Sequence, residues 1–202
     1  MHVRTLLPAL ALCLAAALPA LAQTAPPTRI RGTIEAVDAH TLTVKSRDGQ
    51  TIPIMLNDPL TVLSLKKVDL ASVAPGTFIG TATRLGPGGT RVAIEVLVFP
   101  EAARGSGEGN YPWDLEPGSM MTNATISGAV EKSSGREFSL TYKDGTQTVT
   151  VPPDVPVVTF VPAARADLKP GAPVFLAATR TGDGMFAASR VIVGKDGVNP
   201  PM

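Results

Sequence analysis

The chain has 202 residues, with 18 basic and 17 acidic side chains and a formal net charge of +1 at pH 7. This balance gives no support for binding to nucleic acid or to anionic lipid through a polybasic surface. Nineteen Gly and nineteen Pro, together with many Val and Thr residues, favour short strands and turns over helices.

Residues 1–22 have the pattern of a secretory signal peptide. His2 and Arg4 precede an apolar run from Leu6 to Leu18, and Ala20-Leu21-Ala22 forms a small-residue cleavage site. The run is shorter than the roughly 20 apolar residues that a membrane-spanning helix needs. We therefore expect cleavage after Ala22 and a periplasmic or secreted protein that does not span the membrane.

A lipoprotein anchor at Cys13 is the alternative, which Leu12 disfavours because a small residue should precede such a cysteine. Cleavage after Ala22 removes Cys13 and leaves His40 as the single His. A Cys nucleophile, a disulfide framework and a site with two His or Cys ligands are then excluded. His40 and Asp38 are too close in sequence for a Ser-His-Asp triad, and no G-x-S-x-G elbow occurs. We expect a protein that is not an enzyme and needs no cofactor.

Two segments of the chain resemble each other, which predicts an internal duplication. The interval from Gly32 to Asp48-Gly49 matches that from Gly128 to Asp144-Gly145, with 16 residues in each and an offset of 96. Later turn signals keep nearly the same spacing: Pro75-Gly76 with Pro170-Gly171, and T-A-T-R at 81–84 with A-A-T-R at 177–180. Copy one is expected over 30–99 and copy two over 126–194.

Apolar residues alternate with period two in each copy, as in half-buried strands. The Asp-Gly pairs predict hairpins, because Gly accepts positive φ. A short helical turn before each Pro-Gly separates three early strands from two later ones, expected at 77–84 and 91–99 in copy one and at 174–180 and 186–193 in copy two. This is the strand count of an OB-like barrel. The prediction is an all-β chain of two tandem five-stranded OB-like barrels, with a flexible N-terminus over 23–29 and a C-terminal tail over 195–202.

Several motifs of the copies carry a resemblance: R-G-T-I-E-A-V-D at 31–38, D-L-K-P-G at 167–171 and G-D-G-M-F-A-A-S-R-V-I-V at 182–193. Through them the chain resembles a family of bacterial exported proteins of unknown function built from OB-like barrels. The central segment at 107–125 is similar to one in exported chains sometimes labelled metal ABC transporter permease components. In those chains His often stands where this chain has Asn110, and the similarity implies a role in metal handling.

The central stretch at 100–125 has four acidic side chains against one basic side chain, and it contains the only Trp. We predict an ordered acidic and aromatic connecting loop that docks on one of the mildly basic copies. Asn110, Tyr111, Trp113 and Asp114 are the candidate ligand-binding residues, because aromatic rings beside a carboxylate suit a sugar ring, a cation or a peptide. The alternative, which we favour, is that both aromatic side chains anchor the loop on a barrel.

A metal site in the central stretch would use Asp114, Glu116, Met120 and Met121, with the Met sulfurs suited to cuprous ion. Glu101 and Glu108, together with the same two acids, form the calcium alternative. Ordinary packing of Met and a solvated acidic loop are the competing interpretations.

The sequence thus predicts an exported, non-enzymatic binding or interaction module whose partner is an envelope protein or a small ligand, and not nucleic acid. An accessory metal-handling protein, with ligands from the central loop, is the alternative. The sequence leaves the oligomeric state open.

Overall fold

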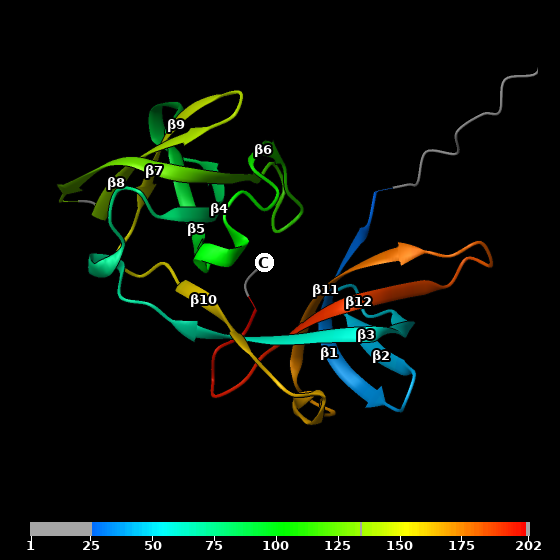
Figure 1. Ribbon diagram of the computed structural model, residues 1–202. Helices are drawn as coiled ribbons and strands as arrows, with labels where there is room; N and C mark the ends of the chain where they lie inside the picture. Colours follow the sequence, from blue (N-terminus) through cyan, green and yellow to red (C-terminus); the bar gives the residue numbers. More distant parts are fainter. Residues whose placement is uncertain (1–25, 134, 201–202) are drawn as a thin grey trace, which may run out of the picture.

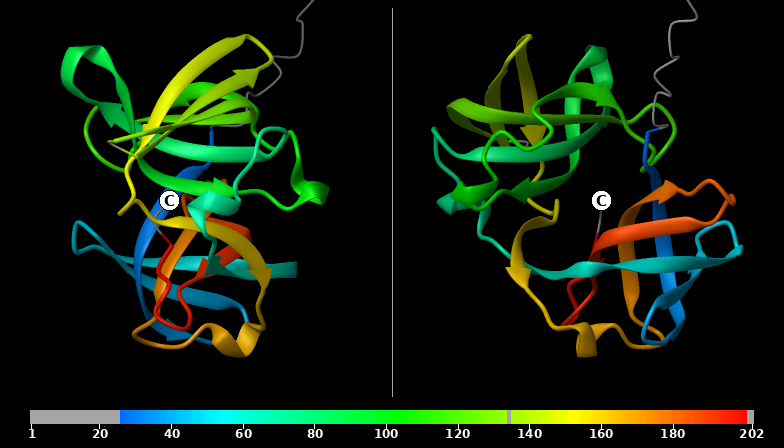
Figure 2. Two further views of the ribbon diagram at one scale, coloured as in Figure 1. Left: turned by 90° about the vertical axis from the view of Figure 1, so that its left-hand side faces the viewer. Right: turned by 45° about the vertical axis from the view of Figure 1, so that its right-hand side comes forward.

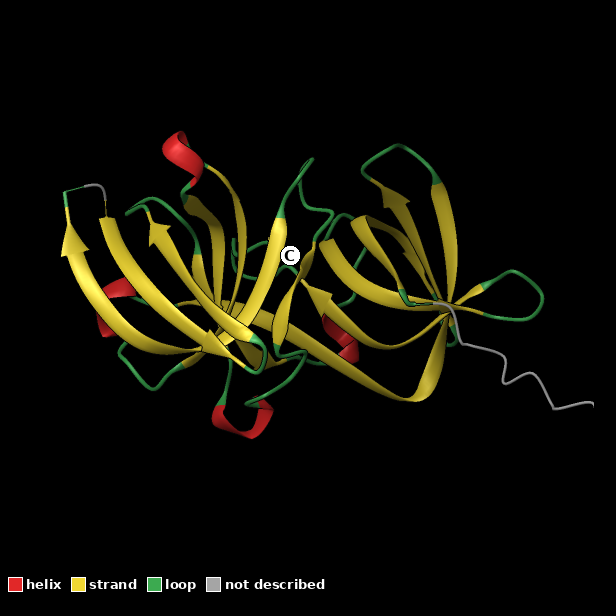
Figure 3. Ribbon diagram, turned by 90° about the horizontal axis from the view of Figure 1, so that it is seen from above, coloured by secondary structure: helices red, strands yellow, loops and turns green. Residues whose placement is uncertain are grey.

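The computed structural model describes residues 26–133 and 135–200, so the expected signal peptide lies outside the described residues. The described chain is built of strands with a few single-turn 3-10 helices (Figure 3), which confirms the all-β prediction. No helix in these ranges is long and apolar enough to cross a membrane.

The strands in chain order are β1 (Thr28–Val37), β2 (Thr41–Ser46), β3 (Thr51–Lys67), β4 (Phe78–Leu85), β5 (Arg91–Val98), β6 (Gly109–Pro112), β7 (Met120–Lys132), β8 (Gly135–Tyr142), β9 (Gly145–Val151), β10 (Val157–Pro162), β11 (Pro173–Arg180) and β12 (Phe186–Val193). The 3-10 turns are η1 (Leu70–Ser72), η2 (Pro87–Gly89), η3 (Glu101–Ala103) and η4 (Arg165–Asp167). Strands β4, β5, β11 and β12 lie within one residue of their predicted bounds. The turns η1 and η4 precede the two Pro-Gly pairs, as expected.

The strand pairings close two rings of five. The first ring runs β1-β2-β3-β12-β11 and closes through the antiparallel pair of β11 with β1. The second ring runs β4-β5-β9-β8-β7, and its parallel pair of β5 with β9 covers only Arg91↔Val149 and Val92↔Thr150. Each ring encloses its own apolar core, centred on residues such as Leu42 and Ile54 in the first and Phe138 and Ile79 in the second.

Each ring takes strands from both copies of the repeat, so two tandem barrels closed within 30–99 and 126–194 are not confirmed. The first ring combines β1 to β3 of copy one with β11 and β12 of copy two, and the second combines β7 to β9 with β4 and β5. The physical cause is the length of β3, whose 17 residues carry the chain out of the first ring and into the second. Figures 1 and 2 show β3 and β10 running between the two lobes.

Strands β3 and β10 cross at the centre of the molecule as an antiparallel pair. Their register contains Leu65↔Phe160 and Ser64↔Val161. Positions 64 and 160, like 65 and 161, are equivalent at the expected repeat offset of 96, so the crossing pairs equivalent positions of the two copies. A third apolar cluster, which includes Leu65, Leu97 and Phe175, lies around this crossing and joins the two rings.

The register of the repeat needs a correction in its first strand. A bulge between Ile34 and Ala36 in β1 corresponds to one between Ile126 and Gly128 in β7, so the two bulges are offset by 92 and not by 96. The hairpin of β7 and β8 is therefore longer, and Gly32 is not equivalent to Gly128. A Cβ at Gly32 would lie 2.0 Å from the Lys45 carbonyl oxygen, which explains the glycine there.

Three expected boundaries also change. Strand β1 begins at Thr28, inside the range expected to be flexible, and β7 begins at Met120, inside the expected loop. The described part of the tail is packed, because Lys195 forms a bridge with Val198 and an ion pair of 3.0 Å with Asp167. Pairing with β11 orders the start of β1, and pairing with β4 orders the start of β7.

Candidate functional site

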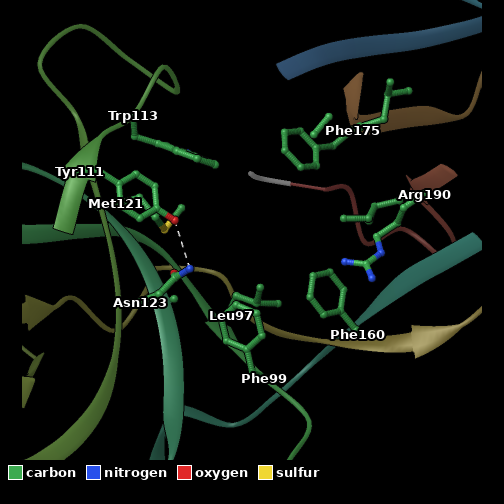
Figure 4. Close-up of a pocket in the computed structure, with 13 residues that line it drawn as sticks. Leu97, Phe99, Tyr111, Trp113, Met121, Asn123, Phe160, Phe175 and Arg190 are labelled. Atoms are coloured by element: carbon green, nitrogen blue, oxygen red, sulfur yellow. Dashed lines mark hydrogen bonds between the residues drawn. The ribbon is translucent and has the colours of Figure 1, made fainter. Parts of the chain in front are cut away.

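A cavity of about 290 Å³ lies between the two rings. Five aromatic side chains line it: Phe99, Tyr111, Trp113, Phe160 and Phe175. They come from the end of β5, from β6 and its following turn, from β10 and from β11, so both rings and the crossing contribute. Figure 4 shows Tyr111 and Trp113 on one side of the cavity and Phe175 and Arg190 on the other.

The hairpin of β6 and β7 carries one wall of the cavity. Tyr111 is paired with Met121, which is 4% exposed and also lines the cavity. The turn after β6 is closed by Ser119, whose backbone carbonyl accepts from Trp113 N at 2.8 Å and whose hydroxyl donates to Trp113 O at 2.9 Å. The central stretch is therefore an ordered hairpin, where the sequence predicted an ordered loop.

Asn123 holds the hydroxyl group of Tyr111 in place. Its side-chain amide donates to Tyr111 Oη at 3.2 Å and to Ser106 O at 3.1 Å. The Asn123 residue is 7% exposed, and within residues 26–133 and 135–200 its Oδ1 has no hydrogen-bond partner. Gly80 faces this oxygen, and a Cβ there would lie 2.5 Å from it, so the wall requires a glycine. Burial raises the pKa of the Tyr111 hydroxyl, against the opposing charge of Arg29.

Two arginines of β1 hold the turn at Trp113 and Asp114. The guanidinium of Arg29 lies over the Trp113 ring at 3.9 Å, and Arg31 Nη2 lies 3.0 Å from Asp114 Oδ1. Arg31 also lies over the ring of Phe175, at 4.9 Å. Partial burial alone would raise the pKa of Asp114, but the hydrogen bond and charge of Arg31, with the charge of Arg29, hold it below its ordinary value. The acidic stretch thus docks on a basic strand, as the charge distribution predicted.

A buried carboxyl group lies on β5. Glu95 is 1% exposed, and neither of its side-chain oxygens has a hydrogen-bond partner in the described residues. Burial raises the pKa of Glu95 to about 8, although the charges of Arg31 and Arg47 act in the opposite direction. Burial therefore favours the protonated form of Glu95 at neutral pH.

No family model, curated protein or solved structure matches this chain. The site must accordingly be interpreted from its own residues. Of the four candidate ligand-binding residues, Tyr111 and Trp113 line the cavity. Asn110 is exposed and accepts from Thr122 Oγ1 at 3.3 Å, and Asp114 is turned to the arginines of β1.

The candidate metal ligands do not converge on one point, and two of the acidic side chains are already paired with arginines. Met120 and Met121 are adjacent in β7 and therefore point to opposite faces. Asp114 is ion-paired with Arg31, and Glu101 with Arg104. In the part of the chain that the structure describes, no group of three or more His, Cys, Asp or Glu side chains could hold a metal ion. A metal role stays a prediction, which a rise in melting temperature with added metal ions would support.

His40 lies exposed in the turn before β2. Asp38 accepts from the backbone N–H groups of His40 and Thr41, each at 2.8 Å. These bonds lower the pKa of the Asp38 carboxyl. In this arrangement Asp38 shapes the turn backbone.

The sequence did not identify the far wall of the cavity, formed by Phe160, Phe175 and Arg190. These residues lie in copy two, Phe160 on the crossing strand β10 and Phe175 and Arg190 on the exchanged strands β11 and β12. Their spacing in the sequence therefore gives no indication that they meet Trp113. The sequence does contain a signal for Arg29 and Arg31. Two cations at i and i+2 of a strand lie on the same face and could pair with the acidic stretch.

Proposed function

We propose that the protein is an exported, non-enzymatic binding module of the cell envelope, and that a small and largely apolar ligand occupies the cavity between its rings. The observation that carries this proposal is a cavity of about 290 Å³ with five aromatic side chains in its walls. Small-molecule sites are mostly apolar cavities of roughly 300–1,000 Å³ with a few polar groups, and this cavity is near the lower limit. Export rests on the signal-peptide pattern of residues 1–22.

The finer fold assignment belongs to the same proposal. In each ring the first three strands form an antiparallel meander, the third pairs in parallel with the last, and the first pairs with the fourth. We propose that each ring is an OB-like barrel whose last two strands come from the other copy. The exchange places the ligand cavity at the junction of the two barrels.

Titration of the chain from Gln23 onward with 1-naphthylacetamide, followed by calorimetry, tests the proposal. Ala177 is an exposed residue of β11 that lines the cavity, so Ala177→Phe should fill the space without disturbing either core. Thr179→Phe, two residues further along the same face and outside the cavity lining, is the matched control. We expect saturable binding that Ala177→Phe weakens at least tenfold and Thr179→Phe preserves. Equal binding by the parent chain and Ala177→Phe would contradict the proposal.

A further inference from the structure

A single cationic side chain lies at the far wall of the cavity. Arg190 of β12 is exposed and lines the cavity beside Phe160 (Figure 4). Among the described residues, the side chain of Arg190 makes no hydrogen bond or ion pair. Its guanidinium therefore keeps its full donor capacity at an otherwise apolar wall.

The charges on the other walls have the same sign. Arg29 lies over the ring of Trp113 and Arg31 over that of Phe175, and both rings line the cavity. The carboxylate of Asp114 lies 3.7 Å from Arg29 and 3.0 Å from Arg31. Guanidinium groups thus lie at the far wall and behind two of the lining rings, which favours an anion and disfavours the cation that an aromatic cluster alone would suit.

The lining itself limits how much of a ligand can be charged. Apart from Arg190 and Asn123, the walls consist of apolar and aromatic side chains and of Gly80. Burying a charge against such walls is costly unless a partner compensates it, so the charged group must lie at Arg190.

We propose that the cavity between the rings binds a small amphipathic carboxylate, with its apolar body between Trp113 and Phe160 and its carboxylate on Arg190. A guanidinium matches a carboxylate through two parallel hydrogen bonds. One such group neutralises the single charge of a carboxylate, whereas a phosphate monoester carries nearly two charges at neutral pH. The inference rests on the proposed function, since it specifies the ligand of the same cavity.

Calorimetry with a pair of probes of matched shape tests the inference. The parent chain is titrated with 1-naphthylacetate, with the neutral 1-naphthylacetamide and with 1-naphthyl phosphate, at low and moderate salt. We expect 1-naphthylacetate to bind about tenfold more tightly than the amide, with a difference that narrows as salt rises. Arg190→Gln should remove this preference, because it weakens the binding of 1-naphthylacetate more than that of the amide. Arg84→Gln, an exposed arginine of β4 outside the cavity lining, is the matched control and should retain the preference.

The outcomes separate the inference from the proposed function. Equal affinity of the parent chain for acetate and amide, or an unchanged preference in Arg190→Gln, overturns the carboxylate assignment, and so does tighter binding of the phosphate. If Ala177→Phe still blocks both probes in that case, the proposed function stands. Absence of saturable binding by any probe to the parent chain, or full binding by Ala177→Phe, overturns both.

Discussion

The guanidinium carbon of Arg29 lies 3.9 Å from the centre of the Trp113 ring. Arg29 belongs to the first ring of strands, whereas Trp113 follows β6, the strand that extends the second ring. The contact therefore fastens one ring to the other at the wall of the cavity. The ion pair of Arg31 and Asp114 lies beside this contact. The central stretch therefore both connects the two rings and forms one wall of the cavity.

Trp113 should report this docking directly, because it is the only Trp of the chain. Its ring lies against Arg29 and packs on the cluster between the rings, so we expect emission shifted to the blue of an unfolded control and weak quenching by acrylamide. Emission and quenching equal to those of the chain in guanidinium chloride would contradict the docked hairpin.

Asp114→Asn should destabilise the protein by about 1 kcal/mol at pH 7, because it removes the carboxylate that is ion-paired with the buried Arg31. The loss stays small because Asp114 is partly exposed and solvent screens the ion pair. The folded-state pKa of Asp114 is lowered, so its contribution is present above its unfolded pKa and is lost as pH falls through the folded value. Urea unfolding at pH 7 and below pH 3.8 should show the deficit of the variant shrinking in acid. Asp154→Asn, at an exposed turn, is the control. A deficit independent of pH would exclude a charge effect.

Glu95→Gln should stabilise the protein at neutral and higher pH. The pKa of Glu95 is about 8 in the folded chain and near its ordinary value when unfolded, so folding retains a proton that the unfolded chain releases. Stability of the parent chain should fall on the order of 1 kcal/mol per pH unit between the two values. Glu95→Gln should flatten this slope, whereas the exposed Glu108→Gln should preserve it. Identical slopes in parent and Glu95→Gln would show that Glu95 is ionised in the folded state.

Gly80→Ala should lower the free energy of unfolding by roughly 1–3 kcal/mol, as overpacking does in a tight site. Its Cβ would lie 2.5 Å from Asn123 Oδ1 and 3.1 Å from Phe99, which must both move. Gly128→Ala is the comparison, since its nearest neighbour would be 3.6 Å away. Thermal unfolding of both variants measures the difference. Equal melting temperatures would mean that Asn123 can shift without cost.

Separate fragments 23–99 and 100–202 should each fail to form a closed ring as a monomer. The first fragment lacks β11 and β12, and the second lacks β4 and β5, so both leave strand edges unpaired. Far-ultraviolet circular dichroism and size-exclusion chromatography should show a folded complex only after mixing. A folded monomer of residues 23–99 would show that copy one can close its own barrel.

Local patterns were sufficient for the strands, hairpins and turns. The alternation around Leu42 and Leu140 depends only on neighbouring residues, and a strand half-buried in either ring has the same alternation. Gly49 has the positive φ of 85° that the Asp-Gly signal predicts. Gly145 does not belong to the positive-φ set, because its hairpin turns through Lys143 and Asp144. The Asp-Gly signal thus predicts the position of each turn correctly, but it does not always predict the backbone conformation of the glycine.

The sequence by itself determined an all-β chain with repeated turn signals and an acidic, aromatic centre beside basic strands. The tertiary structure alone decided which strands close which ring. Two copies with the same pattern offer equivalent partners, and the long β3 resolves the choice by reaching Lys67 in the other lobe. That exchange brings Phe160, Phe175 and Arg190 to face Trp113 and so creates the cavity. A cavity between exchanged strands depends on contacts far apart in the chain, which spacing and periodicity do not encode.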